Sequence, residues 1–100
     1  MLQLVETDTF SKWLGGLRDS VTRTRIQARL DRLALGNPGD VKAIGEGVSE
    51  MRIHHGPGYR VYFMRSAKTI IVLLAGGDKR TQRRDIAVAL DLAKSIRSMK

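Results

Sequence analysis

The chain has 100 residues, no cysteine and a formal net charge of +8, because 18 Lys and Arg stand against 10 Asp and Glu. This length predicts a single domain over residues 1–100, the lack of cysteine excludes disulfides and thiolate metal sites, and 42% hydrophobic residues exclude a disordered chain. The charge favours polyanionic partners, above all nucleic acid, over a basic surface that is only solvated or docks an acidic protein.

The N-terminus and the apolar segments give no sign of export or membrane insertion. Residues 1–6 have neither a basic lead nor a long apolar run, so no signal peptide is predicted. The longest strongly apolar stretch, Ile70 to Ala75, is far too short to span a bilayer. The sequence therefore predicts a cytoplasmic protein without a membrane partner.

Two amphipathic helices are predicted after a short first strand at residues 2–6. Asp8 is the expected cap of the first helix and Ser20 of the second. Apolar residues recur at three- and four-residue spacing, which predicts a helical hairpin; they are Phe10, Trp13, Leu14, Leu17, Ile26, Leu30 and Leu33. Arginines surround the second helix, and they form either its solvated face or a surface that contacts RNA or a protein partner; they are Arg18, Arg23, Arg25, Arg29 and Arg32.

From Val48 the apolar period changes to two, which predicts strands at residues 48–54 and 59–64 joined by a turn at residues 55–58. If these strands pair antiparallel, one face of the hairpin collects the polar side chains Glu50, Arg52, His54, Arg60 and Tyr62. Residues 69–75 are apolar or β-branched, as in a strand covered on both faces.

The glycine pair Gly76-Gly77 follows this last strand and is expected to turn the chain sharply. The turn would present Asp78, Lys79 and Arg80 at the sheet edge. A final helix is predicted from about Gln82. The order of strand, two helices, three strands and helix predicts an α+β domain, in which an antiparallel sheet packs against the helical hairpin.

These segments carry a family resemblance. The strings are Val48-Ser49-Glu50-Met51-Arg52-Ile53, Gly56-Pro57-Gly58-Tyr59-Arg60-Val61-Tyr62-Phe63, Gly76-Gly77-Asp78-Lys79 and Asp85-Ile86-Ala87. In this order, over nearly the whole chain, they resemble the RelE/ParE toxin superfamily. Within it, the chain is most similar to the HigB-like branch, often described as addiction-module killer proteins.

The resemblance implies a small RelE-like domain that is the toxin of a type II toxin–antitoxin system. Family members of the RelE and HigB type are metal-independent endoribonucleases that enter the ribosome and cut messenger RNA. A cognate antitoxin, expected to be a small helix-turn-helix protein, blocks them, and no cofactor is implied. Two alternatives stay open: a ParE-like inhibitor of DNA gyrase, and a toxin-like binding protein without catalysis.

The implied reaction needs groups that take a proton, stabilise a doubly charged phosphorane and protonate the leaving oxygen. By the resemblance, Arg60 grips the scissile phosphate, Arg52 assists it, and Lys79 holds the phosphate or protonates the leaving oxygen. The proton acceptor is Glu50, which we place first, or His54. A carboxylate between arginines has a lowered pKa and is a weak base, whereas histidine titrates near neutrality.

Three further residues, Tyr59, Tyr62 and Arg80, are expected to contact RNA. Tyr62 either stacks on a base or is a half-buried aromatic of the sheet. Asp78 is a further candidate for the proton acceptor. No zinc site is expected at His54 and the neighbouring histidine, because ligands at suitable spacing are missing.

Structural roles are the alternatives for the charged residues. Glu50 and Arg52 would then form only a surface ion pair. Arg60 would then clamp the last helix through Asp85 or Asp91.

Overall fold

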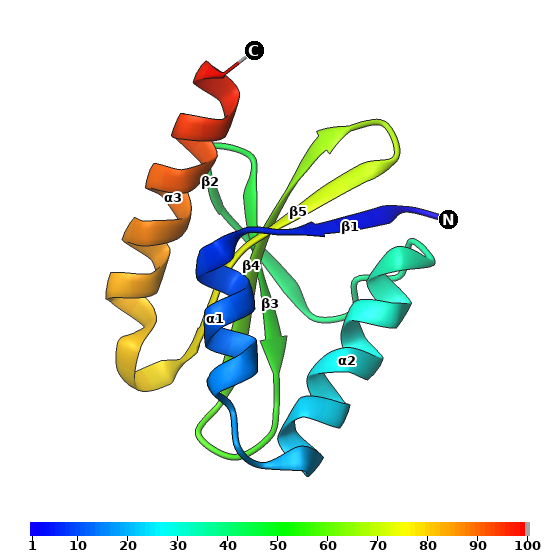
Figure 1. The fold of residues 1–100 in the computed structure, drawn as a ribbon, viewed down its shortest axis with the longest axis vertical. Helices are drawn as coiled ribbons and strands as arrows, with labels where there is room; N and C mark the ends of the chain where they lie inside the picture. Colours follow the sequence, from blue (N-terminus) through cyan, green and yellow to red (C-terminus); the bar gives the residue numbers. More distant parts are fainter. Residues whose placement is uncertain (100) are drawn as a thin grey trace.

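The chain forms a five-stranded sheet with helices on both faces (Figure 1). The structure is a computed structural model, and it describes residues 1–99. The strands are β1 (Gln3–Glu6), β2 (Val41–Gly45), β3 (Val48–Ile53), β4 (Tyr59–Ala67) and β5 (Ile70–Asp78). The helices are α1 (Asp8–Gly16), α2 (Ser20–Ala34), the short 3-10 helix η1 (Lys79–Thr81) and α3 (Gln82–Ser98).

The α+β class predicted from the sequence is confirmed, with one strand more than expected. The extra strand β2 lies at the sheet edge and pairs with β3 through a turn at Glu46 and Gly47. Both turn residues have positive φ, 54° and 73°, which suits the two-residue turn that joins twisted antiparallel strands. Because β2 is largely exposed, it lacks the alternation of buried residues by which strands are found in a sequence.

The sheet is mixed rather than wholly antiparallel. Its strand order is β1-β5-β4-β3-β2, and β1 runs parallel to β5 while the other neighbours pair antiparallel. Parallel strands need a long crossover connection, and here both first helices and three strands lie between the two partners. The N-terminal strand therefore covers the outer edge of β5.

Each of the first two helices is capped one residue before the predicted position. Thr7 rather than Asp8 caps α1, and Asp19 rather than Ser20 caps α2; both caps accept a hydrogen bond from a backbone N–H of the first turn. Asp8 and Ser20 are the first helical residues instead. Within residues 1–99, no helix has the length and apolar character needed to cross a membrane.

Two apolar cores, one on each face of the sheet, hold the layers together. Helices α1 and α2 cover one face, where the buried residues are Phe10, Ile26, Leu30, Leu33, Met51, Ile53, Val61, Phe63, Ile71 and Leu73. Helix α3 covers the other face, where they are Val48, Tyr62, Met64, Val72, Leu74, Ala75, Ala89 and Ala93. The predicted alternation along the hairpin is confirmed, because successive residues of β3 and β4 enter different cores.

Gly76 and Gly77 continue strand β5 instead of turning the chain, so the expectation of a sharp turn there is wrong. The lack of space for a side chain explains why glycine stands at these two positions. A Cβ on Gly76 would overlap the ring of Trp13, and a Cβ on Gly77 would overlap the carboxylate of Asp85. The glycines thus let α1 and the beginning of α3 approach the sheet closely.

Candidate functional site

Four of the five polar side chains predicted to converge from β3 and β4 do so on the face covered by α3; the fifth, His54, follows the end of β3 and lies apart from them. In the register of the two strands Glu50 pairs with Tyr62, and Arg52 pairs with Arg60. Since paired residues point to the same face, these four side chains gather on one surface of the sheet. Three of them are buried, and Arg52 is half-buried.

Glu50 is the centre of this group and is only 1% exposed. Its Oε2 accepts hydrogen bonds from the Tyr62 hydroxyl at 3.0 Å and from Gln82 Nε2 at 2.8 Å, and its Oε1 accepts one from Arg52 Nε at 3.4 Å. Arg60 Nε lies 3.9 Å from Oε2 in an ion pair. Burial of the carboxylate rules out a mere surface ion pair with Arg52. It also argues against Glu50 as the first choice of proton acceptor, because this carboxylate is enclosed by its own donors.

Arg60 lies between the buried cluster and the surface. The residue is 7% exposed, its Nη1 donates to the carbonyl of Gly58 at 3.4 Å, and its Nε has no hydrogen-bond partner among residues 1–99. This Nε faces the buried Glu50 carboxylate, so Glu50 compensates the charge of Arg60 from the buried side. The alternative of a clamp on α3 is wrong, because the ion pairs of the described chain join Arg60 to Glu50 and not to Asp85 or Asp91.

A pocket of about 330 Å³ opens beside Arg60 at the turn between β3 and β4, and we call it the turn pocket. It is lined by His54, His55, Gly56, Pro57, Gly58, Arg60 and Lys79. Lys79 is exposed and begins η1 directly after β5, and its aliphatic stem lies against Gly58, where an added Cβ would come within 3.1 Å of it. Of the predicted site residues, the structure brings Arg60, Lys79 and His54 together in this pocket.

Asp40 holds His54 at the rim of the turn pocket. The imidazole Nε2 lies 2.7 Å from Asp40 Oδ2, and the two side chains are 75% and 44% exposed. The hydrogen bond from His54 is the main cause that lowers the pKa of Asp40, and the charges of Arg52 and Arg29 act in the same direction. No sequence pattern pointed to Asp40, because this residue precedes β2 and no regular spacing relates it to His54.

The two predicted aromatic RNA contacts lie away from the turn pocket's open side. Tyr62 is fully buried under α3, so base stacking by this residue is wrong and it is an aromatic of the sheet core. Burial, followed by the neighbouring charge of Glu50, raises the pKa of its hydroxyl above the ordinary value. Tyr59 is half-buried on the opposite face, where its ring centroid lies 6.4 Å from that of Trp13 and 6.4 Å from that of His55. Tyr59 therefore packs against the ring of His55 and does not line the turn pocket.

Asp78 and Arg80 form a pair next to the turn pocket. Arg80 Nη2 lies 2.9 Å from Asp78 Oδ2, and the Asp78 carboxylate also accepts the backbone N–H of Arg80. The side-chain hydrogen bond lowers the pKa of Asp78 and raises that of Arg80. Asp78 is consequently a weak proton acceptor. Arg80 remains exposed, and its contact with RNA stays a prediction.

Gln82 is a second residue that sequence reasoning missed. It is the first residue of α3, and its hydrogen bond to Glu50 ties this helix to the polar cluster. A single glutamine at a helix start carries no pattern from which this contact follows. Among residues 1–99, no group of three or more His, Asp or Glu side chains is placed to hold a metal ion.

Two comparisons relate the chain to known proteins. The model of a family described as "Phage derived protein Gp49-like (DUF891)" matches residues 12–95. A protein of Haemophilus influenzae that bears the name "Uncharacterized protein" is 42% identical over 95 residues, which make up 95% of this chain and 96% of that protein. The residues matched by the family model include the whole turn pocket and the buried cluster around Glu50.

Proposed function

We propose that this chain, which belongs to the phage-derived Gp49-like family, is the toxin of a type II toxin–antitoxin pair and cuts messenger RNA on the ribosome. The Gp49-like family is toxin-like and related to the RelE/ParE addiction modules. Within that relationship we place the chain nearest to the HigB-like branch, on the strand and turn strings around Glu50, Arg60 and Lys79.

The observation that carries this proposal is the state of Arg60. Its guanidinium is almost fully buried and is held at the wall of the turn pocket by an ion pair with Glu50 on the buried side. Lys79 supplies a second positive charge to the same pocket. A phosphodiester offers acceptor oxygens to both groups and gains negative charge as it reacts, so this pair of cations favours phosphoryl transfer.

In the proposed reaction a ribose 2′-hydroxyl attacks the neighbouring phosphorus. His54 takes the hydroxyl proton, the O2′–P bond forms, the P–O5′ bond breaks, and Lys79 gives a proton to the departing 5′ oxygen. The products are a 2′,3′-cyclic phosphate and a free 5′-hydroxyl. Arg60 stabilises the doubly charged phosphorane between these steps, while Glu50 holds Arg60 in position from the buried side.

Asp40 and Arg52 support this set without entering the turn pocket. The carboxylate of Asp40 orients the His54 ring through Nε2 and stabilises the imidazolium that forms when the ring takes a proton. Arg52 is fixed by Glu50 and adds positive charge beside the Asp40–His54 pair. The positive charge of Arg52 therefore attracts the phosphate as it approaches the turn pocket.

The other partners follow from the proposal. The chain would be neutralised by a cognate antitoxin, for which we propose a small helix-turn-helix protein, and it would act on translating ribosomes in the cytoplasm. The net charge of +8 supports binding to a surface of ribosomal RNA, since a field of that sign and size attracts polyanions.

Primer extension on messenger RNA after brief induction of the chain tests this proposal. We expect new 5′ ends within translated codons, and a loss of cleavage of about 100-fold or more in Lys79→Ala, which removes an exposed general acid without opening the core. The matched control is Lys94→Ala, which removes the same charge from the exposed side of α3. Arg60→Ala should also abolish cleavage, but it removes one of the two arginines that pair with the buried Glu50 in the described chain and so also lowers stability.

The alternatives predict different results in the same cells. Unchanged transcripts together with trapped gyrase–DNA breaks would replace the nuclease with a ParE-like gyrase inhibitor. Unchanged transcripts without such breaks, from a chain that still binds its antitoxin, would leave a toxin-like binding protein without catalysis.

A further inference from the structure

A second basic pocket adjoins the turn pocket on the side of helix α2, and we call it the α2 pocket. It measures about 270 Å³, and its lining includes Arg25, Arg29 and Arg32 together with His54 and His55. The same two histidines line the turn pocket. The two hollows therefore lie side by side, with His54 and His55 in the walls of both.

The three arginines of the α2 pocket have different tasks. They follow one another at intervals of four and three residues, which places them on one face of the helix. Arg29 is structural, because its Nη1 donates to the carbonyl of Arg52 at 2.7 Å and its Nη2 to that of Pro38 at 3.1 Å. Burial, and then the like charge of Arg32, lowers the pKa of Arg29.

Arg25 and Arg32 are left to bind a ligand. Both are exposed, and neither side chain has a hydrogen-bond or ion-pair partner among residues 1–99. Of the acidic groups near this region, Asp40 is already bonded to His54, and Asp31 accepts a hydrogen bond from Gln27. The α2 pocket thus holds two guanidinium groups whose charge is not neutralised within the described chain.

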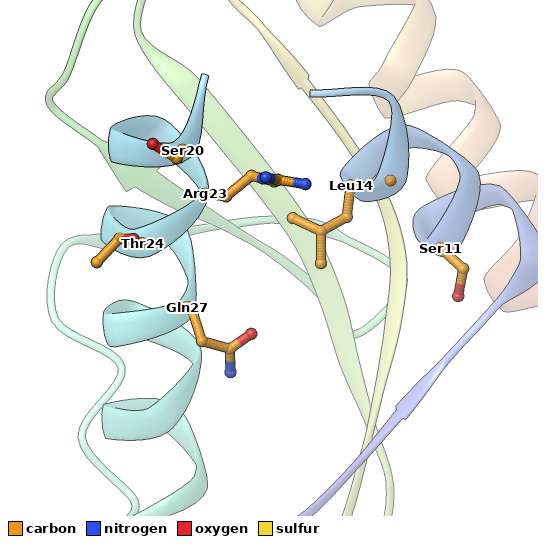
Figure 2. Close-up of a pocket in the computed structure, with 7 residues that line it drawn as sticks. Ser11, Leu14, Ser20, Arg23, Thr24 and Gln27 are labelled. Atoms are coloured by element: carbon orange, nitrogen blue, oxygen red, sulfur yellow. The ribbon is translucent and has the colours of Figure 1, made fainter. Parts of the chain in front are cut away.

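The opposite side of α2 shows that this charge is not spread evenly around the helix. There a groove of about 490 Å³ separates α2 from α1, and Figure 2 shows Arg23 and Gln27 pointing from α2 toward Leu14 of α1. Of the described residues that line this groove, Arg23 alone is charged. A helix that used arginine only for solvation would have no reason to concentrate cations on the side that faces the turn pocket.

We infer that the turn pocket and the α2 pocket form one track for the backbone of a single-stranded RNA. The scissile phosphate lies against Arg60 and Lys79, the strand passes His54 and His55, and two phosphates farther along the strand lie against Arg25 and Arg32. Guanidinium groups match phosphate oxygens in geometry, and positive grooves of this kind follow a nucleic-acid backbone without regard to sequence. This inference rests on the proposed function and gives the same site a second, non-catalytic subsite.

Binding of two non-cleavable ligands tests the track. The probes are a dinucleotide and a single-stranded RNA of about eight nucleotides, both with 2′-O-methyl riboses, measured by fluorescence anisotropy at several salt concentrations. For Arg25→Ala/Arg32→Ala we expect unchanged binding of the dinucleotide and a loss of about 25-fold for the longer RNA near 0.1 M salt. This value follows from a salt slope of about 0.7 per phosphate contact, so the slope itself should fall by about 1.4.

Matched variants separate the track from a general effect of charge. Arg23→Ala/Lys94→Ala removes two positive charges that line neither pocket, and it should bind the longer RNA nearly as the unaltered chain does. Lys79→Ala should weaken both ligands, because both occupy the turn pocket. Thermal unfolding of every variant verifies that these exposed substitutions leave the fold intact.

Three results would overturn the track. If both double variants lose the same affinity for the longer RNA, net charge alone explains the binding. If the unaltered chain does not bind the longer RNA, the track has no ligand; and if Arg25→Ala/Arg32→Ala loses only antitoxin binding, the α2 pocket is a protein-docking surface. Failure of the proposed function gives a different result. In that case the chain would still need Arg25 and Arg32 to bind RNA but would cut no transcript in the primer-extension experiment, so the track would stand and the nuclease activity would not.

Discussion

The two faces of the sheet are built from the same strands but are closed in different ways. The face under α1 and α2 is covered mainly by apolar side chains, with Phe10 fully enclosed and no buried charge among residues 1–99. The face under α3 begins with an apolar core and ends, toward the turn pocket, in a polar cluster of the buried Glu50, Arg60 and Tyr62 and the half-buried Gln82. One face is therefore a uniform core and the other changes along its length.

This difference indicates what each face is for. A buried ion pair adds little net stability compared with apolar side chains of the same volume, so the Glu50–Arg60 pair is not explained by the stability of the fold. It is explained if Arg60 must be held in one position at the wall of the turn pocket. The apolar face supplies stability, and the polar end of the α3 face sets the geometry of the candidate site.

The largest expected effect is on stability alone, from Phe10→Ala. Phe10 is fully buried and packs against Trp13 with the rings tilted by 53° at a centroid distance of 5.7 Å, so its removal should lower the free energy of unfolding by about 4 kcal/mol. Urea unfolding measures the loss. At a temperature where the variant is still folded, its RNA cleavage per folded molecule should equal that of the unaltered chain. A selective loss of cleavage would contradict the division between the two faces.

A smaller loss of stability with a larger loss of activity is expected from Glu50→Gln. The amide has the same shape but leaves Arg60 without its buried counter-charge and turns an –NH₂ group toward existing donors, which should cost about 3 kcal/mol in urea unfolding. Cleavage by the folded fraction should fall because Arg60 is no longer held. The matched control is Glu46→Gln in the exposed β2–β3 turn, with an expected effect within about 0.5 kcal/mol. A folded Glu50→Gln variant with full activity would show that the cluster does not position Arg60.

Much of the fold was predictable because regular elements repeat a period in the sequence. The helical spacing of Ile26, Leu30 and Leu33 and the alternation through Val48 to Tyr62 each mark a buried face, and each face is where it was expected. The edge strand β2 was missed because only Val41 and Ile44 are partly buried in it, three residues apart and against different cores, so no period of two appears. Gly76 and Gly77 were misread as a turn, since a sequence does not distinguish a glycine needed for φ from one needed for space.

The candidate site was predictable only in part, and burial is the reason. Strand alternation correctly brought Glu50, Arg52, Arg60 and Tyr62 to one face, but alternation does not state how deeply a side chain lies. Depth separates Arg60, which borders a pocket, from Tyr62, which does not reach the surface. Asp40 and Gln82 enter through contacts between segments far apart in the chain, and no local pattern encodes such contacts.

The smallest expected effect is the most specific test of the polar end of the α3 face. Tyr62→Phe keeps the buried ring and removes only the hydroxyl that donates to Glu50 at 3.0 Å. At pH 7 we expect a loss of about 1 kcal/mol in urea unfolding. Tyr59→Phe is the control, because the Tyr59 hydroxyl has no hydrogen-bond partner within residues 1–99 and its removal should change stability by less.

The pH dependence of the same variant distinguishes a buried Tyr62 hydroxyl from an exposed one. Burial raises its pKa in the folded chain above the ordinary value of about 10, so between these two pKa values the unfolded chain has lost a proton that the folded chain keeps. The Tyr62 contribution to stability is therefore complete below about pH 10 and declines above it, by up to about 1.4 kcal/mol per pH unit. Since Tyr62→Phe has no such proton, its stability should approach and then exceed that of the unaltered chain as the pH rises above 10. A constant difference between the two chains would mean that Tyr62 reaches water, and that the polar end of the α3 face is open rather than enclosed.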